Sequence, residues 1–322
     1  MPQTRGHAPS PLAPRPAPSR SQHELPVVTP YRLDLTVSAL RRLSTNVVDV
    51  LTPDGQYVRA LDGAHGPVIA RVTQVRPDAL TVTIEGDAGE HARVLALARR
   101  MLGVDRELTH FDRAVARMAW LSPLALRMRG VKPPRYPTLW EAFVNVIAFQ
   151  QVSLHAASAI VRRLIVAFSQ PLESDGMSLY TFPSAEQVVG AEDVLLRATG
   201  LSAGKVATLR RAGEALASAT LDESMLEERA SPDAAALLRQ INGIGPWTAT
   251  VILLRGLGRL DVFPMNDTSV ARNLALVAGA VPLDVDSILR ALGPQQGMLY
   301  YHLLLARLEA RGEVGRASSV VV

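Results

Sequence analysis

The segment that decides the fold is Leu237–Leu257, LLRQINGIGPWTATVILLRGL, in which two apolar helix-forming runs flank a tight corner. The corner holds Gly243 and Gly245, and Pro246 and Trp247 follow directly. A helix tolerates proline best in its first turn, so a new helix is expected to begin at Pro246. The glycines permit a sharp turn and leave backbone N–H groups uncovered, and the helix N-terminus adds partial positive charge. This combination suits a phosphate group.

Two other interpretations compete with phosphate binding. In the first, the corner is only a structural connection between two helices. In the second, Gly243 and Gly245 begin a dinucleotide-binding fingerprint. Thr248 replaces its third glycine, however, and the preceding segment has the pattern of a helix rather than a strand. The fingerprint is therefore disfavoured, whereas the structural connection stays open on the local sequence.

The composition excludes several classes of protein. With 322 residues, 48% of them hydrophobic, the chain can bury a core and suggests two domains. It has no cysteine, which excludes disulfides, thiolate zinc sites, iron–sulfur clusters and cysteine nucleophiles and fits a cytoplasmic protein. No apolar run reaches the roughly 20 residues of a membrane span, and no signal peptide is evident. The net charge of +4 is small, so a nucleic-acid surface would have to be a local patch.

The first part of the chain predicts a small α+β domain behind a tail. Residues 1–26 are rich in proline without an apolar period, and we expect them to be disordered. Apolar and polar residues then alternate with a period of two, which predicts an antiparallel sheet with one buried face. The predicted strands are 31–37, 56–62, 67–75 and 80–86, and the predicted helices are 38–43 and 89–102. We place this domain at residues 27–110.

The strand pattern ends after Phe111, and residues 111–312 are predicted to be all helical, followed by a C-terminal tail at 313–322. Thr138 and Glu141 form a T-x-x-E capping box that opens an apolar run. Ser202 is placed to cap the next helix, and residues 298–310 read as a last amphipathic helix. The predicted fold class is therefore α+β, a small antiparallel-sheet domain followed by an all-α region.

Three segments of this sequence resemble one family. INGIGPWTA, residues 241–249, resembles the hairpin of the helix-hairpin-helix DNA glycosylase superfamily. DVFPMNDTSVARNL, residues 261–274, resembles the segment that carries its catalytic aspartate, and Asp267 follows Trp247 by the spacing of the 3-methyladenine DNA glycosylase II branch. IAFQQVS, residues 147–153, is similar to the glutamine-bearing helix end of that branch. The resemblance extends over about residues 27–311, including the α+β domain.

The resemblance implies a monofunctional DNA N-glycosylase of base excision repair, a monomer that flips alkylated purines out of duplex DNA and releases them. Asp267 would be the catalytic carboxylate, stabilising an oxocarbenium-like sugar. Trp247 and Gln150 would line the base pocket, and Gln151 would enter the gap in the duplex. Backbone binding would involve Gly243, Gly245 and Thr248. The hairpin carbonyls of the family can also hold a monovalent cation; no other cofactor or metal is expected.

Lyase chemistry needs an amine that forms a Schiff base with the sugar. Trp247 stands where resembling bifunctional enzymes carry a lysine, and the only lysines, Lys132 and Lys205, lie outside the hairpin. The sequence therefore predicts base release without strand cleavage. Val251 and Leu304 stand where further pocket aromatics are expected, with the nearby pair Tyr300 and Tyr301 not obviously equivalent. The base preference is therefore left open.

Each site residue also has a plain structural interpretation. Asp267 precedes a helix and is suited to be an N-cap, the two glutamines suit a solvated helix end, and Trp247 suits core packing. At the level of the whole protein, a non-catalytic DNA clamp built on the same hairpin is the main alternative. A glycosylase for oxidised or mismatched bases is disfavoured by the missing lysine and cysteines.

Overall fold

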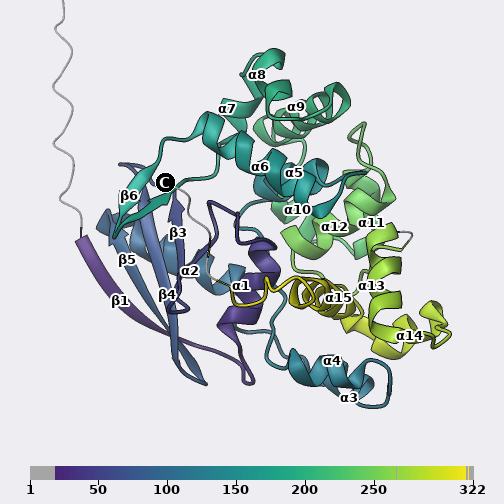
Figure 1. Cartoon of the computed structure of the whole chain (residues 1–322). Helices are drawn as coiled ribbons and strands as arrows, with labels where there is room; N and C mark the ends of the chain where they lie inside the picture. Colours follow the sequence, from purple (N-terminus) through teal and green to yellow (C-terminus); the bar gives the residue numbers. More distant parts are fainter. Residues whose placement is uncertain (1–18, 266, 317, 319–322) are drawn as a thin grey trace, which may run out of the picture.

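The computed structural model describes residues 19–265, 267–316 and 318, and places an antiparallel sheet beside a larger helical region (Figure 1). The five strands of the sheet follow the order β1-β5-β4-β3-β2, each pairing antiparallel with its neighbour. They are β1 (Ser19–Pro26), β2 (Val50–Leu51), β3 (Tyr57–Leu61), β4 (Val68–Arg76) and β5 (Ala79–Gly86). This order confirms the predicted α+β fold class.

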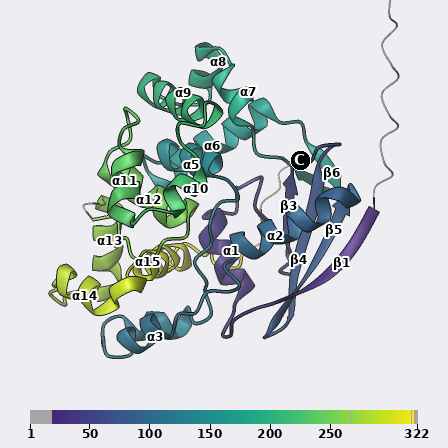
Figure 2. The same ribbon diagram turned by 180° about the vertical axis from the view of Figure 1, so that it is seen from behind.

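The predicted alternation places the core of the first domain correctly. On β5, Leu80, Val82 and Ile84 are fully buried, because successive side chains of a strand point to opposite faces. The helix α2 (His91–Met101) follows a single 3₁₀ turn, η1 (Ala88–Glu90), and lies across one face of the sheet (Figure 2). The strands predicted at 56–62, 67–75 and 80–86 and the helix at 89–102 are confirmed.

The strand predicted at residues 31–37 is wrong, because this segment forms the helix α1 (Leu33–Arg41). Its alternating residues Leu33, Leu35 and Val37 are buried, but so are the polar residues Thr36, Ser38 and Arg41. The helix is enclosed between the sheet and the helical region, so burial does not follow one face. A period of two therefore carried no information about strand geometry here.

The prediction of disorder for residues 1–26 is wrong for its last part. Residues 19–26 form β1, an edge strand that pairs with β5 from Ser19 opposite Gly86 to Pro26 opposite Ala79. Only Leu25 of this strand enters the core, so the strand is held mainly by backbone hydrogen bonds, which have no sequence signature. Residues 1–18 lie outside the described residues.

The helical region is built from many short helices around two apolar clusters. Its helices are α3 (Thr109–Val115), α4 (Ser122–Arg127), α5 (Leu139–Ala148), α6 (Leu154–Phe168), α7 (Ala185–Val189), α8 (Asp193–Ala198), α9 (Ala203–Ala217), α10 (Glu223–Glu227), α11 (Ser231–Leu238), α12 (Pro246–Gly256), α13 (Thr268–Ala278), α14 (Val285–Leu292), the 3₁₀ turn η2 (Gly293–Gln295) and α15 (Gly297–Glu309). No helix in the described part of the chain is long and apolar enough to cross a membrane.

The region is mostly helical rather than all helical, which corrects the prediction for residues 111–312. A short β-hairpin, β6 (Leu172–Ser174) and β7 (Met177–Leu179), turns at Asp175 and Gly176, both with positive φ. Asp-Gly is a strong signal for such a turn, but the flanking strands of three residues each are too short to give an alternating pattern. Arg71 of β4 donates to Ser174 and pairs with Asp175 at 2.7 Å, so this hairpin attaches to the sheet.

Two predicted helix caps are confirmed. The Thr138 side chain accepts the Glu141 N–H at 3.1 Å, and the Ser202 side chain accepts the Lys205 N–H at 3.3 Å. The Glu141 carboxylate does not close the predicted capping box, because it points to Arg59 instead. The last helix, α15, was predicted to be amphipathic but is buried on most sides, packed against α1, α4 and α13.

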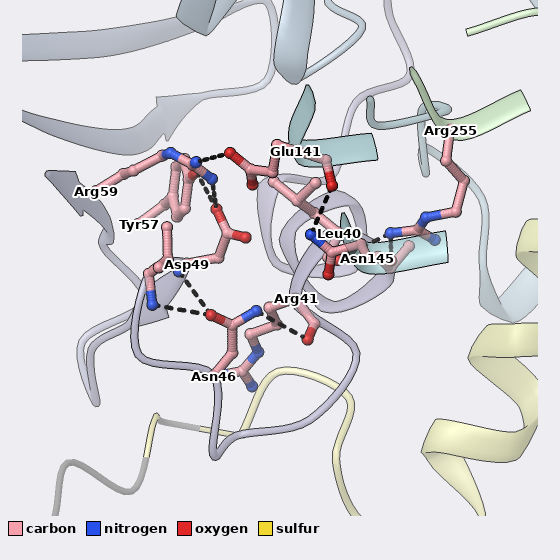
Figure 3. A network of polar contacts seen from close by, with 11 residues as sticks. Leu40, Arg41, Asn46, Asp49, Tyr57, Arg59, Glu141, Asn145 and Arg255 are labelled. Atoms are coloured by element: carbon pink, nitrogen blue, oxygen red, sulfur yellow. Dashed lines mark hydrogen bonds and ion pairs between the residues drawn. The ribbon is translucent and has the colours of Figure 1, made fainter. Parts of the chain in front are cut away.

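A buried cluster of charges joins the sheet to the helical region (Figure 3). Arg59 of β3 donates from Nη1 to Asp49 at 2.6 Å and from Nη2 to Glu141 of α5 at 2.5 Å. The Tyr57 hydroxyl donates to the same Asp49 oxygen at 2.7 Å. Burial raises the pKa of Glu141 to about 7; the Asp49 charge adds to this increase and Arg59 opposes it.

This raised pKa predicts that the free energy of unfolding falls as the pH rises from about 4.5 to about 7. In that window folded Glu141 holds a proton that the unfolded chain has released, since its ordinary pKa is 4.5. Raising the pH then favours the unfolded chain, by less than about 1.4 kcal/mol per pH unit. Urea unfolding of the wild type and of Glu141→Gln across this window measures the effect.

The Glu141→Gln variant keeps an acceptor for Arg59 but cannot titrate, so its stability should lack this slope. Glu173→Gln, at an exposed position of β6, is the matched control and should keep the slope of the wild type. Equal slopes for the wild type and Glu141→Gln would contradict the assignment.

Candidate active site

The hairpin between α11 and α12 forms as predicted, but its two glycines have different tasks. Gly243 has φ +102°, and a Cβ there would lie 1.9 Å from Thr208 Oγ1 on α9. Gly243 is therefore required by backbone conformation and by the close packing of α9. Gly245 caps α12 with φ −86°, and a Cβ added there would meet no heavy atom within 4 Å. Gly245 thus presents bare backbone to open space, directly before Pro246 in the first turn.

Asp267 is both a helix cap and a wall of the site. Its Oδ1 accepts the N–H groups of Ser269 at 2.6 Å and Val270 at 3.3 Å at the start of α13. Its Oδ2 accepts the indole N–H of Trp247 at 2.7 Å. Asp267 can therefore be a helix cap and a site residue at once, because Oδ1 caps α13 and Oδ2 binds Trp247 in the cavity wall. The helix N-terminus and the indole together hold a carboxylate in one orientation.

The two glutamines lie in the loop between α5 and α6 and differ in role. Gln150 donates from Nε2 to Gly243 O at 3.0 Å and to Thr248 Oγ1 at 2.9 Å, so it is tied to the hairpin. Gln151 is exposed, with φ +56°, a conformation uncommon outside glycine. Ser153 then caps α6 through the Ala156 N–H. The loop therefore holds one glutamine in place and projects the other.

The side chain of Thr248 is enclosed in the protein. Its side chain is only 3% exposed and its hydroxyl accepts the Gln150 amide. The first turn of α12 faces the protein at this position, which the local sequence did not reveal. Thr248 positions Gln150.

All seven predicted site residues line one cavity of about 950 Å³. It opens between the hairpin, α13, the α5–α6 loop, α9, α15 and the end of α1. A volume of this size suits a small-molecule or base site. Sequence reasoning did not single out several other residues of its wall, among them Arg42, Phe149, Arg272, Asn273, Leu303 and Arg307.

The wall has an uneven distribution of charge. Its basic residues are Arg42, Lys205, Arg272 and Arg307, and its one acid is Asp267. This is the local basic patch that the small net charge required, and it suits a ligand with phosphate groups. The patch comes from four separate elements, so no charge run in the sequence announced it.

The aromatic residues of the cavity are Trp247, Phe149 and Tyr300. Of the positions where aromatics were expected, Leu304 does line the cavity, whereas Val251 is buried in the core of the helical region. Tyr301, the neighbour of Tyr300, is fully buried as well. The site therefore takes one of its aromatic faces from Tyr300.

Of the two lysines, Lys205 lines the cavity and Lys132 does not. Lys132 is buried away from the cavity, where its Nζ donates to Arg106 O. Lys205 lies in the cavity wall, and its Nζ donates to Ala148 O at 2.9 Å, the last residue of α5. Burial lowers the pKa of Lys205. An amine is thus present at the site although it is remote from the hairpin in sequence.

The hairpin carbonyls do not favour the cation that the resemblance implied. Ile241 O accepts the Ile244 N–H at 3.0 Å, and Gly243 O accepts the Gln150 amide at 3.0 Å. Asn242 O accepts the Arg211 guanidinium at 3.3 Å. A metal ion at Asn242 O would share that oxygen with the cationic Arg211 guanidinium, and the other two carbonyls already accept neutral N–H donors.

No family model matches the chain, but individual proteins are similar to it. The chain is similar to a probable bifunctional transcriptional activator and DNA repair enzyme, AlkA, of Mycobacterium tuberculosis, 29% identical over 240 residues, which are 73% of this chain and 47% of that protein. It is 26% identical to a DNA-3-methyladenine glycosylase of Bacillus subtilis over 174 residues, 54% of this chain and 57% of the relative. The chain thus matches about half the length of these relatives.

Solved structures share the fold over nearly the whole chain. A 3-methyladenine DNA glycosylase from Archaeoglobus fulgidus matches with a TM-score of 0.74 at 23% identity, covering 89% of this chain and 99% of that one. An 8-oxoguanine glycosylase/lyase of Clostridium acetobutylicum, solved in complex with double-stranded DNA, matches with a TM-score of 0.68 at 14% identity, covering 91% and 98%. In sequence the chain is similar to AlkA and the 3-methyladenine DNA glycosylases, and it shares its fold with a solved 3-methyladenine DNA glycosylase, in line with the resemblance of its motifs.

Proposed function

We propose that this protein is a monofunctional DNA N-glycosylase that releases alkylated purines such as 3-methyladenine and 7-methylguanine from duplex DNA. The observation that carries the proposal is the Asp267 carboxylate, held at the wall of the cavity by the start of α13 and by Trp247. The names of the sequence relatives support this substrate class.

The first step is the extrusion of the base, which costs a few kcal/mol of stacking and pairing. The N-terminus of α12 at Gly245 and the exposed Arg272 of the wall suit the phosphate backbone, whatever the sequence. Gln151, exposed and held in a left-handed conformation, is the residue we assign to the gap in the duplex.

The chemical step needs one carboxylate. Methylation at N3 of adenine or N7 of guanine gives the base a positive charge and weakens its bond to the sugar. The C1′–N bond breaks with its electron pair going to the base, water adds to C1′, and one proton is released. Asp267 stabilises the positive charge that develops on the sugar. The π faces of Trp247 and Tyr300 suit a cationic base.

Asp267→Asn tests this role directly. Asparagine caps a helix about as well as aspartate, so melting temperature and DNA binding should stay close to those of the wild type. The variant loses the charge that stabilises the transition state, and single-turnover excision should fall at least ~100-fold. Asp284→Asn, at the N-cap of α14 and outside the cavity wall, is the matched control and should change neither property. Full excision by Asp267→Asn would leave only a non-catalytic DNA-binding role.

Gly245→Val tests the hairpin as a backbone clamp. A Cβ at this position meets no heavy atom within 4 Å, so a loss of affinity in a folded variant reports on an external contact. We expect weaker binding to undamaged and damaged duplexes alike, measured by fluorescence anisotropy after circular dichroism has confirmed folding. Gly89→Val, in the exposed turn η1, is the control. Unchanged affinity of Gly245→Val for both duplexes would make the hairpin purely structural.

Borohydride trapping on an abasic-site duplex tests the absence of lyase activity. We expect no covalent complex, because the one lysine of the cavity, Lys205, uses its Nζ to bind the end of α5. A stoichiometric complex in the wild type that disappears in Lys205→Met would identify Lys205 as a nucleophile and refute the monofunctional proposal. A complex that persists in Lys205→Met would refute it through another amine.

A further inference from the structure

Arg42 brings a charge from the N-terminal domain into the cavity. It follows the last residue of α1, lines the cavity wall and is 5% exposed. Its backbone has φ +66° and ψ −73°, a conformation that residues other than glycine rarely adopt. Such strain persists only where the surrounding structure imposes it, and it concentrates at functional sites.

The guanidinium of Arg42 has a stacking partner but lacks an acceptor. Its central carbon lies 3.7 Å from the centre of the Phe149 ring, which also lines the cavity. Its Nη1 is buried without a hydrogen-bond partner, and no carboxylate of the described chain forms an ion pair with it. A buried donor without an acceptor is costly, so a ligand that supplies an acceptor would bind favourably here.

The end of α1 is fixed to the helix that carries the hairpin. Arg255 of α12, fully buried, donates from Nη2 to Ala39 O at 3.0 Å and to Leu40 O at 2.9 Å (Figure 3). Asn46 donates to Arg41 O at 3.2 Å from the other side. These bonds hold the backbone before Arg42 in a constant position relative to α12, and thus to Trp247. Arg42 is therefore part of a preorganised wall.

We propose that Arg42 recognises the extruded base by donating a hydrogen bond to a carbonyl oxygen at its six position. This inference rests on the proposed function and narrows its substrate class to purines of the guanine type. Arginine has donors only, so it can bind the O6 acceptor of guanine, whereas the six position of adenine carries a donor amino group. Stacking on Phe149 leaves the edges of the guanidinium for this contact.

Phosphate is a less suitable acceptor for Arg42 than a base. Arg42 is almost completely buried, whereas Arg272 of the same wall is exposed, as a backbone contact requires. Substitutions of Arg42 and Arg272 should therefore differ in how their effect on base release depends on the lesion. A contact with phosphate affects every duplex alike, and a contact with the base affects one lesion more than another.

The test compares two lesions of equal charge in the same duplex sequence. Both 7-methylguanine and 3-methyladenine are cationic, so the charge of Arg42 acts equally on both, and only the group at the six position distinguishes a hydrogen bond. Arg42→Met keeps an apolar side chain beside Phe149 and removes the donors. We expect single-turnover release of 7-methylguanine to fall about tenfold or more, with release of 3-methyladenine unchanged or faster.

Equal changes for the two lesions would overturn the proposal, as would a selective loss of 3-methyladenine release. Arg272→Met is the matched control and should slow both reactions equally at limiting protein. Arg42→Lys retains a donor, and it keeps the test valid if Arg42→Met does not fold. It should keep part of the preference for 7-methylguanine, and its failure to do so in a folded protein would also count against the proposal.

A binding measurement separates this inference from the proposed function. Duplexes with 2′-fluorinated nucleotides resist glycosidic cleavage, so affinity is measured without turnover. If the wild type releases neither base, the proposed function fails. Preferential binding of the 7-methylguanine duplex that Arg42→Met abolishes would still support the recognition role. Absence of that preference in the wild type would overturn it.

Discussion

The structure depends on one buried guanidinium that two domains share. Arg59 comes from the sheet and pairs with Asp49 beside α1 and with Glu141 in α5. Removing one partner of a buried ion pair leaves an uncompensated charge, typically at a cost of about 3–5 kcal/mol. The sheet and the helical region therefore have a strong reason to keep one arrangement. The cavity takes part of its wall from the end of α1 and from the loop that follows α5, the helix that carries Glu141.

A second constraint operates at Asp267, whose two carboxylate oxygens bind different elements. One oxygen accepts hydrogen bonds from backbone N–H groups at the start of α13, and the other accepts the indole N–H of Trp247. A cap normally serves only its own helix. Here it also holds a carboxylate at the wall of a cavity with aromatic and basic residues. Under the proposed function, such a fixed charge would stabilise a transition state without a cost of reorganisation.

Local motifs were predicted well because their physics is local. The caps at Thr138 and Ser202, the proline in the first turn of α12 and the glycine corner each depend on neighbours within a few residues. Patterns that depend on burial were less informative. The alternation at residues 31–37 belongs to an enclosed helix, and β1 has almost no apolar pattern because it is an edge strand. Gln150 lines the cavity and donates to the Thr248 hydroxyl, a contact between residues 98 positions apart that no local pattern indicates.

The sequence by itself determined the order of the motifs, the helix N-termini at Pro246 and Thr268, and the pairing of an aromatic residue with a carboxylate 20 positions later. Only the tertiary structure decided which further side chains reach the cavity. Arg42, Lys205 and Tyr300 come from three elements far apart in the chain, and Arg42 arrives through a strained backbone held by Arg255. Such residues carry no common period or spacing, because their proximity arises from the packing of helices against one another rather than from bonds between neighbouring residues.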